Sequence, residues 1–117
     1  MKILLINNFH YHKGGSEAVY FHTAEMLENQ GHEVIYFSQK NEFNESSAWE
    51  KYFPKNNNGL PRWKGVCRYF YNREAKKNLE RLVQKEKPDI AHVHLFWGGL
   101  SPSIFSVLKK HRIPIIH

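Results

Sequence analysis

The chain has 117 residues, of which 41% are hydrophobic and 15% aromatic, so its length suits one domain with a substantial core. Its formal net charge of +6 favours anionic partners: nucleotides, nucleic acid or an anionic membrane surface. The one cysteine, Cys67, excludes a disulfide framework within the chain, and no apolar stretch approaches the ~20 residues of a membrane-spanning helix. We therefore expect a cytoplasmic protein or one peripheral on the inner face of a membrane.

The first part of the chain predicts a strand, a helix and a second strand. The apolar run from Lys2 to Asn7 is typical of a buried parallel strand. Residues 16–30 carry apolar side chains at helical spacing, with Ser16 as the expected N-cap and Gly31 in the position of a C-cap glycine. Residues 33–38 (EVIYFS) form the second predicted strand.

The middle of the chain predicts a long loop followed by a long helix. Residues 39–62 are rich in asparagine, proline and glycine, with a short helix expected near residues 47–52. A loop of this length in a compact domain is usually functional or mobile. Residues 64–86 are predicted to be one helix that ends at Lys87-Pro88, with an apolar side made of Val66, Phe70, Ala75, Leu79, Leu82 and Val83.

The last part of the chain predicts two further strands around a short helix. Residues 89–94 form the third predicted strand, and Ser101-Pro102 is expected to start a helix that runs to about His111. Residues 112–117 start a fourth strand. The alternation predicts a Rossmann-like three-layer α/β/α fold, with a parallel sheet in strand order 2-1-3-4.

In such a sheet, ligands bind at the switch point between strands 1 and 3, beside the carboxyl ends of the strands. Residues 8–17 and 95–101 are expected to meet there. Doubly wound sheets normally continue past four strands, so we expect residues 1–117 to be one incomplete N-terminal domain. A small complete domain is the alternative.

The segment Lys13-Gly14-Gly15-Ser16 is the first candidate site, because it lies between strand 1 and helix 1 at the expected switch point. Glycines let a ligand approach the backbone, and the free N–H groups of a helix start suit a phosphate. The alternative is that the two glycines only form a turn. The segment is not the dinucleotide fingerprint, since it has no G-x-G-x-x-G pattern.

Histidines form the second candidate set: His10, His12, His92, His94 and His117. No acidic residue or cysteine completes a ligand pattern at a recognised spacing, so we expect no metal. For His92 we favour a hydrogen-bonded histidine packed under a helix. His94 lies nearer the carboxyl edge and is a better candidate for a residue of the crevice.

Two further segments carry aromatic residues. Trp97 with Gly98-Gly99 would form a rim beside the crevice, although Trp97 could simply cap the core. Basic and aromatic residues alternate in residues 62–71, where Arg62, Trp63, Lys64 and Arg68 are candidates for a membrane face. The alternative, which we favour from the pattern alone, is an amphipathic core helix with a solvated basic face. Nucleic-acid binding is not expected.

Four segments in order carry a family resemblance: MKILLINN, KGGSEAVYFHTAEMLENQGHEV, YNREAKKNLERLVQKEKPDIAHVHLFWGGLSPSI and KKHRIPIIH. Over nearly its whole length the chain resembles the N-terminal domain of glycosyltransferase family 4, the retaining enzymes of the double-Rossmann GT-B fold. The resemblance implies transfer of a sugar from a nucleotide-sugar donor to an acceptor, usually without a metal. It also implies that the glycine-rich loop, with Gly14, Gly15 and Ser16, approaches the diphosphate of the donor.

The resemblance further implies an acceptor crevice, for which His10, Lys13, His94, Trp97 and Gly98 are the candidates. Family members often use glycan or lipid-linked acceptors at the cytoplasmic face of a membrane, in polysaccharide or glycolipid biosynthesis.

Two parts of the family pattern are not found in these residues. Family members usually continue into a Thr-Leu-His-Asp-like segment, whose histidine is a site residue. We expect that histidine just beyond His117 and do not assign its role to His117. The second Rossmann domain, which holds most nucleotide-sugar contacts, is also missing. We therefore expect the chain alone to be inactive. The alternative is a non-catalytic Rossmann-like module that binds an anionic membrane surface or a partner protein.

Overall fold

The computed structural model of the protein describes residues 1–56, 60–96 and 100–116. The strands form a four-stranded parallel sheet in the order β2-β1-β3-β4. In chain order the elements are β1 (Lys2–Ile6), α1 (Gly15–Asn29), β2 (Glu33–Phe37), the 3-10 helix η1 (Glu50–Tyr52), α2 (Arg62–Phe70), α3 (Arg73–Glu86), β3 (Ile90–Val93), α4 (Ile104–Lys110) and β4 (Ile115–Ile116). The predicted α/β class and strand order are confirmed.

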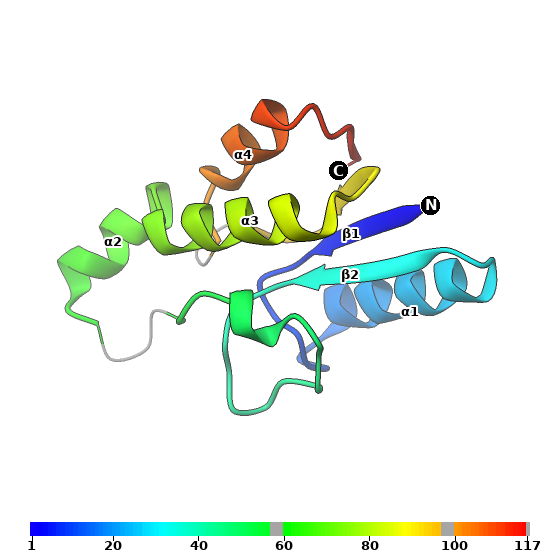
Figure 1. Ribbon diagram of the computed structural model, residues 1–117. Helices are drawn as coiled ribbons and strands as arrows, with labels where there is room; N and C mark the ends of the chain where they lie inside the picture. Colours follow the sequence, from blue (N-terminus) through cyan, green and yellow to red (C-terminus); the bar gives the residue numbers. More distant parts are fainter. Residues whose placement is uncertain (57–59, 97–99, 117) are drawn as a thin grey trace.

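Helices cover both faces of the sheet, with α1 on one face and α3 and α4 on the other (Figure 1). The alternation of side chains along β1 divides the core accordingly, because successive residues of a strand point to opposite faces. Leu4 and Ile6 pack with α3 and α4, whereas Ile3 and Leu5 pack with α1. β1 pairs with both β2 and β3, so its end lies at the centre of the carboxyl edge of the sheet.

The predicted single helix over residues 64–86 is wrong: α2 and α3 are separate helices. Asn72 caps the start of α3, since its side-chain oxygen accepts a hydrogen bond from the backbone N–H of Ala75 at 3.0 Å. Asparagine is among the best N-cap residues, and this one is fully buried. Its own N–H donates to Oγ of Ser101 at 2.9 Å, which ties the break between the two helices to the segment before α4.

The apolar side predicted for that helix is confirmed only for α3. Ala75, Leu79, Leu82 and Val83 are buried in the core. Val66 on α2 is 53% exposed, so the expectation that it belongs to the core is wrong. The side chain of Phe70, the other α2 residue predicted for this apolar side, lies outside the described residues.

Helix ends differ from the predicted caps at two places. Gly14, not Ser16, precedes α1, and Ser103, not Ser101, precedes α4. Gly31 does end α1 as predicted: its φ of 88° is the left-handed conformation typical of a C-cap glycine. Within the described residues, none of the helices combines the length and apolarity that crossing a membrane requires.

Candidate functional site

The carboxyl edge of the sheet is organised by two asparagines that follow β1. Asn7 donates from Nδ2 to a carboxylate oxygen of Glu17 at 3.0 Å, which ties the first turn of α1 to the end of the strand. The Oδ1 of Asn8 accepts from the N–H of Leu100 at 3.1 Å, and its carbonyl accepts from Nε2 of Gln39 at 3.0 Å. Asn8 thus joins three loops at the switch point. The sequence predicted that residues 8–17 and 95–101 meet here, which this bond confirms, but it did not single out Asn8, although a polar residue directly after a buried strand was a usable signal.

The glycine pair lies at the exposed start of α1. Gly14 has an extended backbone, with φ of −170°, and both glycines are exposed. A Cβ added at Gly15 would meet nothing within 4 Å, and one at Gly14 would meet only Oε1 of Glu17, at 3.9 Å. The packing of the chain therefore does not require glycine here. What the pair provides is open space above the N–H groups of a helix start, which suits an anion.

His10 belongs to the core beneath this loop and not to an open crevice. It is only 2% exposed, and its Nδ1 lies 2.9 Å from the hydroxyl of Tyr20. The rings of Tyr36 and Phe53 also contact it. Burial lowers the pKa of His10 to about 4, so the imidazole is neutral near pH 7. Its contribution to a site is to hold the loop in place.

His94 lies at the end of β3, next to β1, where its N–H donates to the carbonyl of Ile6 at 2.8 Å. Its ring packs against His92, with centroids 4.3 Å apart, and against Tyr20, with centroids 5.5 Å apart. Burial, and secondly the charge of His92, lower the pKa of His94 to about 4. In the part of the chain that the structure describes, its buried Nε2 has no hydrogen-bond partner. Tyr20 thus brings His10 and His94 together.

Of the other predicted site residues, some are described in the structure and some are not. Lys13 is exposed, and its Nζ lies 3.9 Å from the ring centroid of Phe9. Ser16 lies in the first turn of α1. Trp97, Gly98 and His117 lie outside the described residues.

Among the residues that are described, no group of three or more histidine, cysteine or acidic side chains could hold a metal ion.

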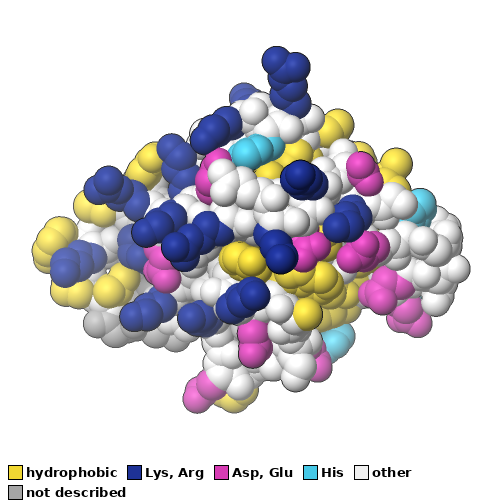
Figure 2. Space-filling view, viewed as in Figure 1, with side chains coloured by type: hydrophobic (Ala, Val, Ile, Leu, Met, Phe, Trp, Pro, Cys, Tyr) yellow, Lys and Arg dark blue, Asp and Glu magenta, His cyan; other side chains and the backbone are white. Residues whose placement is uncertain are grey.

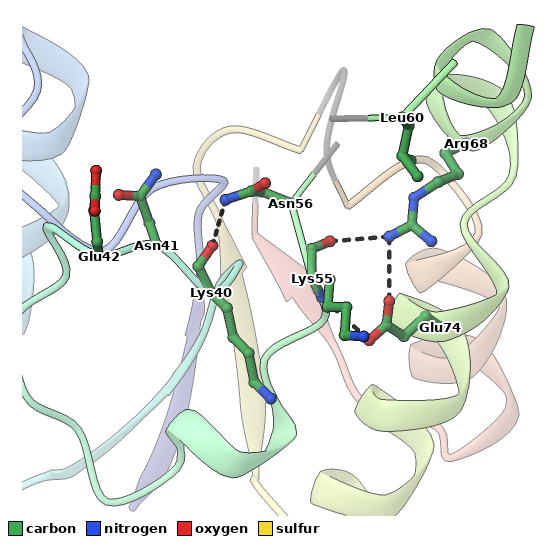
Figure 3. Close-up of a pocket in the computed structure, with 8 residues that line it drawn as sticks. All are labelled: Lys40, Asn41, Glu42, Lys55, Asn56, Leu60, Arg68 and Glu74. Carbon is green, nitrogen blue, oxygen red and sulfur yellow. Dashed lines mark hydrogen bonds and ion pairs between the residues drawn. The ribbon is translucent and has the colours of Figure 1, made fainter. Parts of the chain in front are cut away.

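A polar hollow of about 510 Å³ lies between the long loop after β2 and helices α2 and α3 (Figure 3). Arg68 spans it: its Nη2 donates to the carbonyl of Lys55 at 2.9 Å and to Glu74 at 3.3 Å. The N–H of Lys55 also donates to Glu74, at 3.1 Å. The hollow is lined by Lys40, Asn41, Glu42, Lys55, Asn56, Leu60, Arg68 and Glu74. The length of the loop over residues 39–62 predicted a functional segment. The sequence pattern did not predict which residues of the loop would line a hollow.

The surface of α2 carries both charge and apolar groups. Trp63 is 66% exposed, and Arg62 and Lys64 are exposed beside it. Figure 2 shows lysines and arginines over α2 and α3, with hydrophobic side chains exposed at the α2 end of the molecule. Of the four residues predicted for a membrane face, Arg68 differs, because it forms an ion pair with Glu74.

The sequence matches the family described as Glycosyltransferase Family 4 over residues 13–117. It is also similar to a protein of Klebsiella pneumoniae described as an uncharacterized 42.6 kDa protein in cps region, with 30% identity over 135 aligned positions. That alignment covers 100% of this chain and 36% of the relative, so the chain spans about a third of the relative's length.

Proposed function

This chain belongs to glycosyltransferase family 4, and from that premise we propose that it is the acceptor-side N-terminal part of a retaining glycosyltransferase. The enzyme transfers a sugar from a nucleotide-sugar donor to a glycan or lipid-linked acceptor, in the biosynthesis of a polysaccharide or glycolipid. A C-terminal Rossmann domain of GT-B type supplies most contacts to the donor. The segment beyond His117 supplies the remaining catalytic residues, and the 117 residues alone are inactive.

The observation that carries this proposal is the open space over Gly14 and Gly15 at the start of α1. The loop lies at the switch point, where ligands of open α/β sheets bind. Neither glycine is needed for packing, and this supports a loop whose backbone a ligand approaches closely. A diphosphate suits the site, since the N–H groups and the dipole of a helix start favour negative charge.

In this reaction the bond between the donor sugar and its phosphate breaks, and negative charge grows on the leaving phosphate oxygens. The N–H groups of Gly14, Gly15 and Ser16 stabilise that charge, and no metal is needed for it. His94 is neutral near pH 7, and its backbone N–H holds the end of β3 beside β1 at this edge. Lys13 adds positive charge to the same edge.

The test is Gly15→Val in the full-length protein, assayed by release of nucleoside diphosphate from a panel of nucleotide sugars. A valine side chain has room in the fold but occupies the space that the diphosphate needs. We expect turnover to fall by at least ~100-fold, because a diphosphate kept away from the N–H groups loses stabilisation comparable to that of an oxyanion-type donor. His22→Val is the matched control, because it introduces the same residue at an exposed position of α1. Unchanged turnover in Gly15→Val would contradict the assigned role.

A second binding function is favoured by the exposed face of α2, which we propose rests on an anionic membrane at the cytoplasmic side. Trp63 and Val66 are 66% and 53% exposed, and Arg62 and Lys64 lie among them. Apolar side chains that enter the headgroup boundary and cations that pair with lipid phosphates together make an interfacial helix. This face would hold the enzyme near a lipid-linked acceptor. A non-catalytic module that binds an anionic membrane would use the same face of α2.

Vesicle co-sedimentation tests the membrane contact. We expect the protein to bind vesicles that contain phosphatidylglycerol, to bind phosphatidylcholine vesicles weakly, and to be released by salt. The double variant Arg62→Glu/Lys64→Glu should lose this binding. The matched control Lys109→Glu/Lys110→Glu reverses two exposed charges on α4. Equal loss in both variants would show that net charge, and not α2, is responsible.

A further inference from the structure

Three aromatic rings from two different loops lie together at the carboxyl edge of the sheet. Phe9 and Tyr11 come from the β1–α1 loop, and their ring centroids are 5.7 Å apart. Phe43 comes from the long loop after β2, and its ring centroid is 5.9 Å from that of Tyr11. We call Phe9, Tyr11 and Phe43 the ring platform. Phe43 is 68% exposed, although burial of a phenyl ring is strongly favourable.

Hydrogen bonds tether the backbone of the loop that carries Phe43. The N–H of Phe43 donates to Oδ1 of Asn41 at 3.0 Å, and Nδ2 of Asn44 donates to the carbonyl of Gln39 at 2.8 Å. The N–H of Glu45 donates to the carbonyl of His10 at 2.8 Å, which joins this loop to the β1–α1 loop. The two loops that carry the ring platform are therefore joined to each other through their backbones.

The chain on either side of Phe43 carries polar side chains that line a hollow of their own. Residues on both sides of Phe43 in the chain line a second hollow of about 460 Å³, made by Lys40, Asn41, Glu42, Asn44, Glu50, Lys51 and Phe53. Amides, carboxylates and ammonium groups are the side chains that hydrogen-bond sugar hydroxyls. The carboxylates disfavour an anionic lipid surface at this place. An apolar plate beside such groups suits a sugar ring, which has a C–H face and a rim of hydroxyls.

The ring geometry favours a sugar over a nucleobase. The planes of Phe9 and Tyr11 meet at 71°, and those of Tyr11 and Phe43 at 55°. Rings at these angles do not form a slot with two parallel faces for a flat base. A pyranose needs only one exposed ring for its C–H face, and Phe43 provides it.

We propose that the ring platform binds a pyranose of the acceptor glycan, with its C–H face on Phe43 and Tyr11 and its hydroxyls toward Asn41 and Glu42. This inference rests on the proposed function and names the acceptor subsite within it. Phe43 is a specificity-determining residue and not a catalytic one. The donor diphosphate at Gly14 and Gly15 occupies a different part of the same edge.

Saturation-transfer NMR on the full-length protein tests binding without requiring turnover. The probes are methyl glycosides of glucose, galactose, mannose and N-acetylglucosamine, with uridine and guanosine diphosphates as the donor-side probes. At least one glycoside should receive saturation from the protein, and Phe43→Ala should remove that signal while leaving the nucleotide signal unchanged. Phe43→Trp should retain it, since a larger ring preserves the stacking surface.

Met26→Ala is the matched control, because Met26 is an exposed apolar side chain on α1, 46% exposed and not part of the ring platform. Loss of the glycoside signal in this variant too would overturn the inference. So would the absence of any glycoside signal, an unchanged signal in Phe43→Ala, or a loss confined to the nucleotide. Since Phe43 is largely exposed, its truncation should not affect folding.

Kinetics separate the failure of this inference from the failure of the proposed function. With a transferable acceptor, Phe43→Ala should raise the acceptor KM about tenfold, as loss of one aromatic contact typically does, and leave the donor KM unchanged. Normal transfer by Phe43→Ala would overturn the ring platform and keep the glycosyltransferase. A glycoside signal that depends on Phe43, in a protein with no transfer from any donor, would keep the ring platform and overturn the enzyme.

Discussion

Helices α2 and α3 follow each other directly and carry similar basic residues, but they use their apolar residues in opposite ways. α3 buries Leu79 and Leu82 against the sheet, whereas α2 leaves Trp63 and Val66 exposed. The difference comes from the break between the helices at Tyr71 and Asn72, after which α3 lies on the core while α2 extends beyond it (Figure 1). An amphipathic pattern therefore states that a helix has an apolar side, and only its surroundings decide what that side contacts.

The largest expected effect comes from truncating one apolar side chain on each helix and comparing the free energies of unfolding. Leu79→Ala should lower the free energy of unfolding by about 3 kcal/mol, because Leu79 is fully buried and its loss leaves a cavity. Trp63→Ala should change it by less than ~0.5 kcal/mol, since the indole is mostly exposed. Urea unfolding of the two variants measures both values. Similar losses would mean that α2 also packs on a core.

A second prediction concerns the buried histidine under the glycine loop. The pKa of His10 is lowered to about 4, so the folded state resists the proton that the unfolded state accepts near pH 6.5. Its contribution to stability is complete above pH 6.5 and is lost as the pH falls toward 4. Between pH 7 and pH 5 the free energy of unfolding should fall by roughly 1–2 kcal/mol from this group.

His10→Phe isolates that contribution, because phenylalanine keeps a ring in the cluster and does not titrate. The variant should be less stable at pH 7, having lost the contact with the hydroxyl of Tyr20. Its additional loss of stability at pH 5 should be smaller than that of the unmodified chain. Urea unfolding at both pH values gives the comparison, and an equal pH dependence would exclude His10 as its source.

The boundary between the two helices gives the third prediction. Asn72→Ala removes the cap on the N–H of Ala75 and should lower the free energy of unfolding by about 1–2 kcal/mol. Asn72→Asp keeps a capping oxygen and should lose less. Asn78→Ala, within α3, is the control for losing an asparagine without a cap. Helix content by circular dichroism and urea unfolding would reveal whether the break between α2 and α3 depends on Asn72.

The smallest expected effect lies at the other end of α3. Lys87 has φ of 49°, the left-handed conformation that glycine adopts without strain. Lys87→Gly should raise the free energy of unfolding by about 0.5 kcal/mol, because relief of strain exceeds the added freedom of the unfolded chain. Lys85→Gly, inside the helix, should lower it by about 1 kcal/mol. A destabilised Lys87→Gly would show that the lysine side chain makes a favourable contact there.

Much of the fold followed from local pattern. The apolar runs of β1 and β2 and the helical spacing of α1 place these elements, and their alternation predicts the parallel order β2-β1-β3-β4. The exposed loop of Gly14 and Gly15 at the switch point was also predictable, because topology alone brings it there. The separation of α2 from α3 was not predictable. The role of Asn72 depends on its hydrogen bonds with Ser101 and Ala75, and the bond with Ser101 joins residues far apart in the chain.

The candidate site divides in the same way. Sequence pattern identified His10 and His94, but only their burial in the fold lowers the pKa of each to about 4. No pattern in the sequence selects Phe43, an aromatic residue between polar neighbours in the loop, as a site residue.

By itself, then, the sequence determined the α/β class, the order of the strands and the family, because periodicity and chain order carry that information. The tertiary structure alone decided which apolar residues are buried and which loops meet. Hydrogen bonds such as those from Gln39 to Asn8 and from Glu45 to His10 join residues far apart in the chain, and no local pattern encodes those pairs.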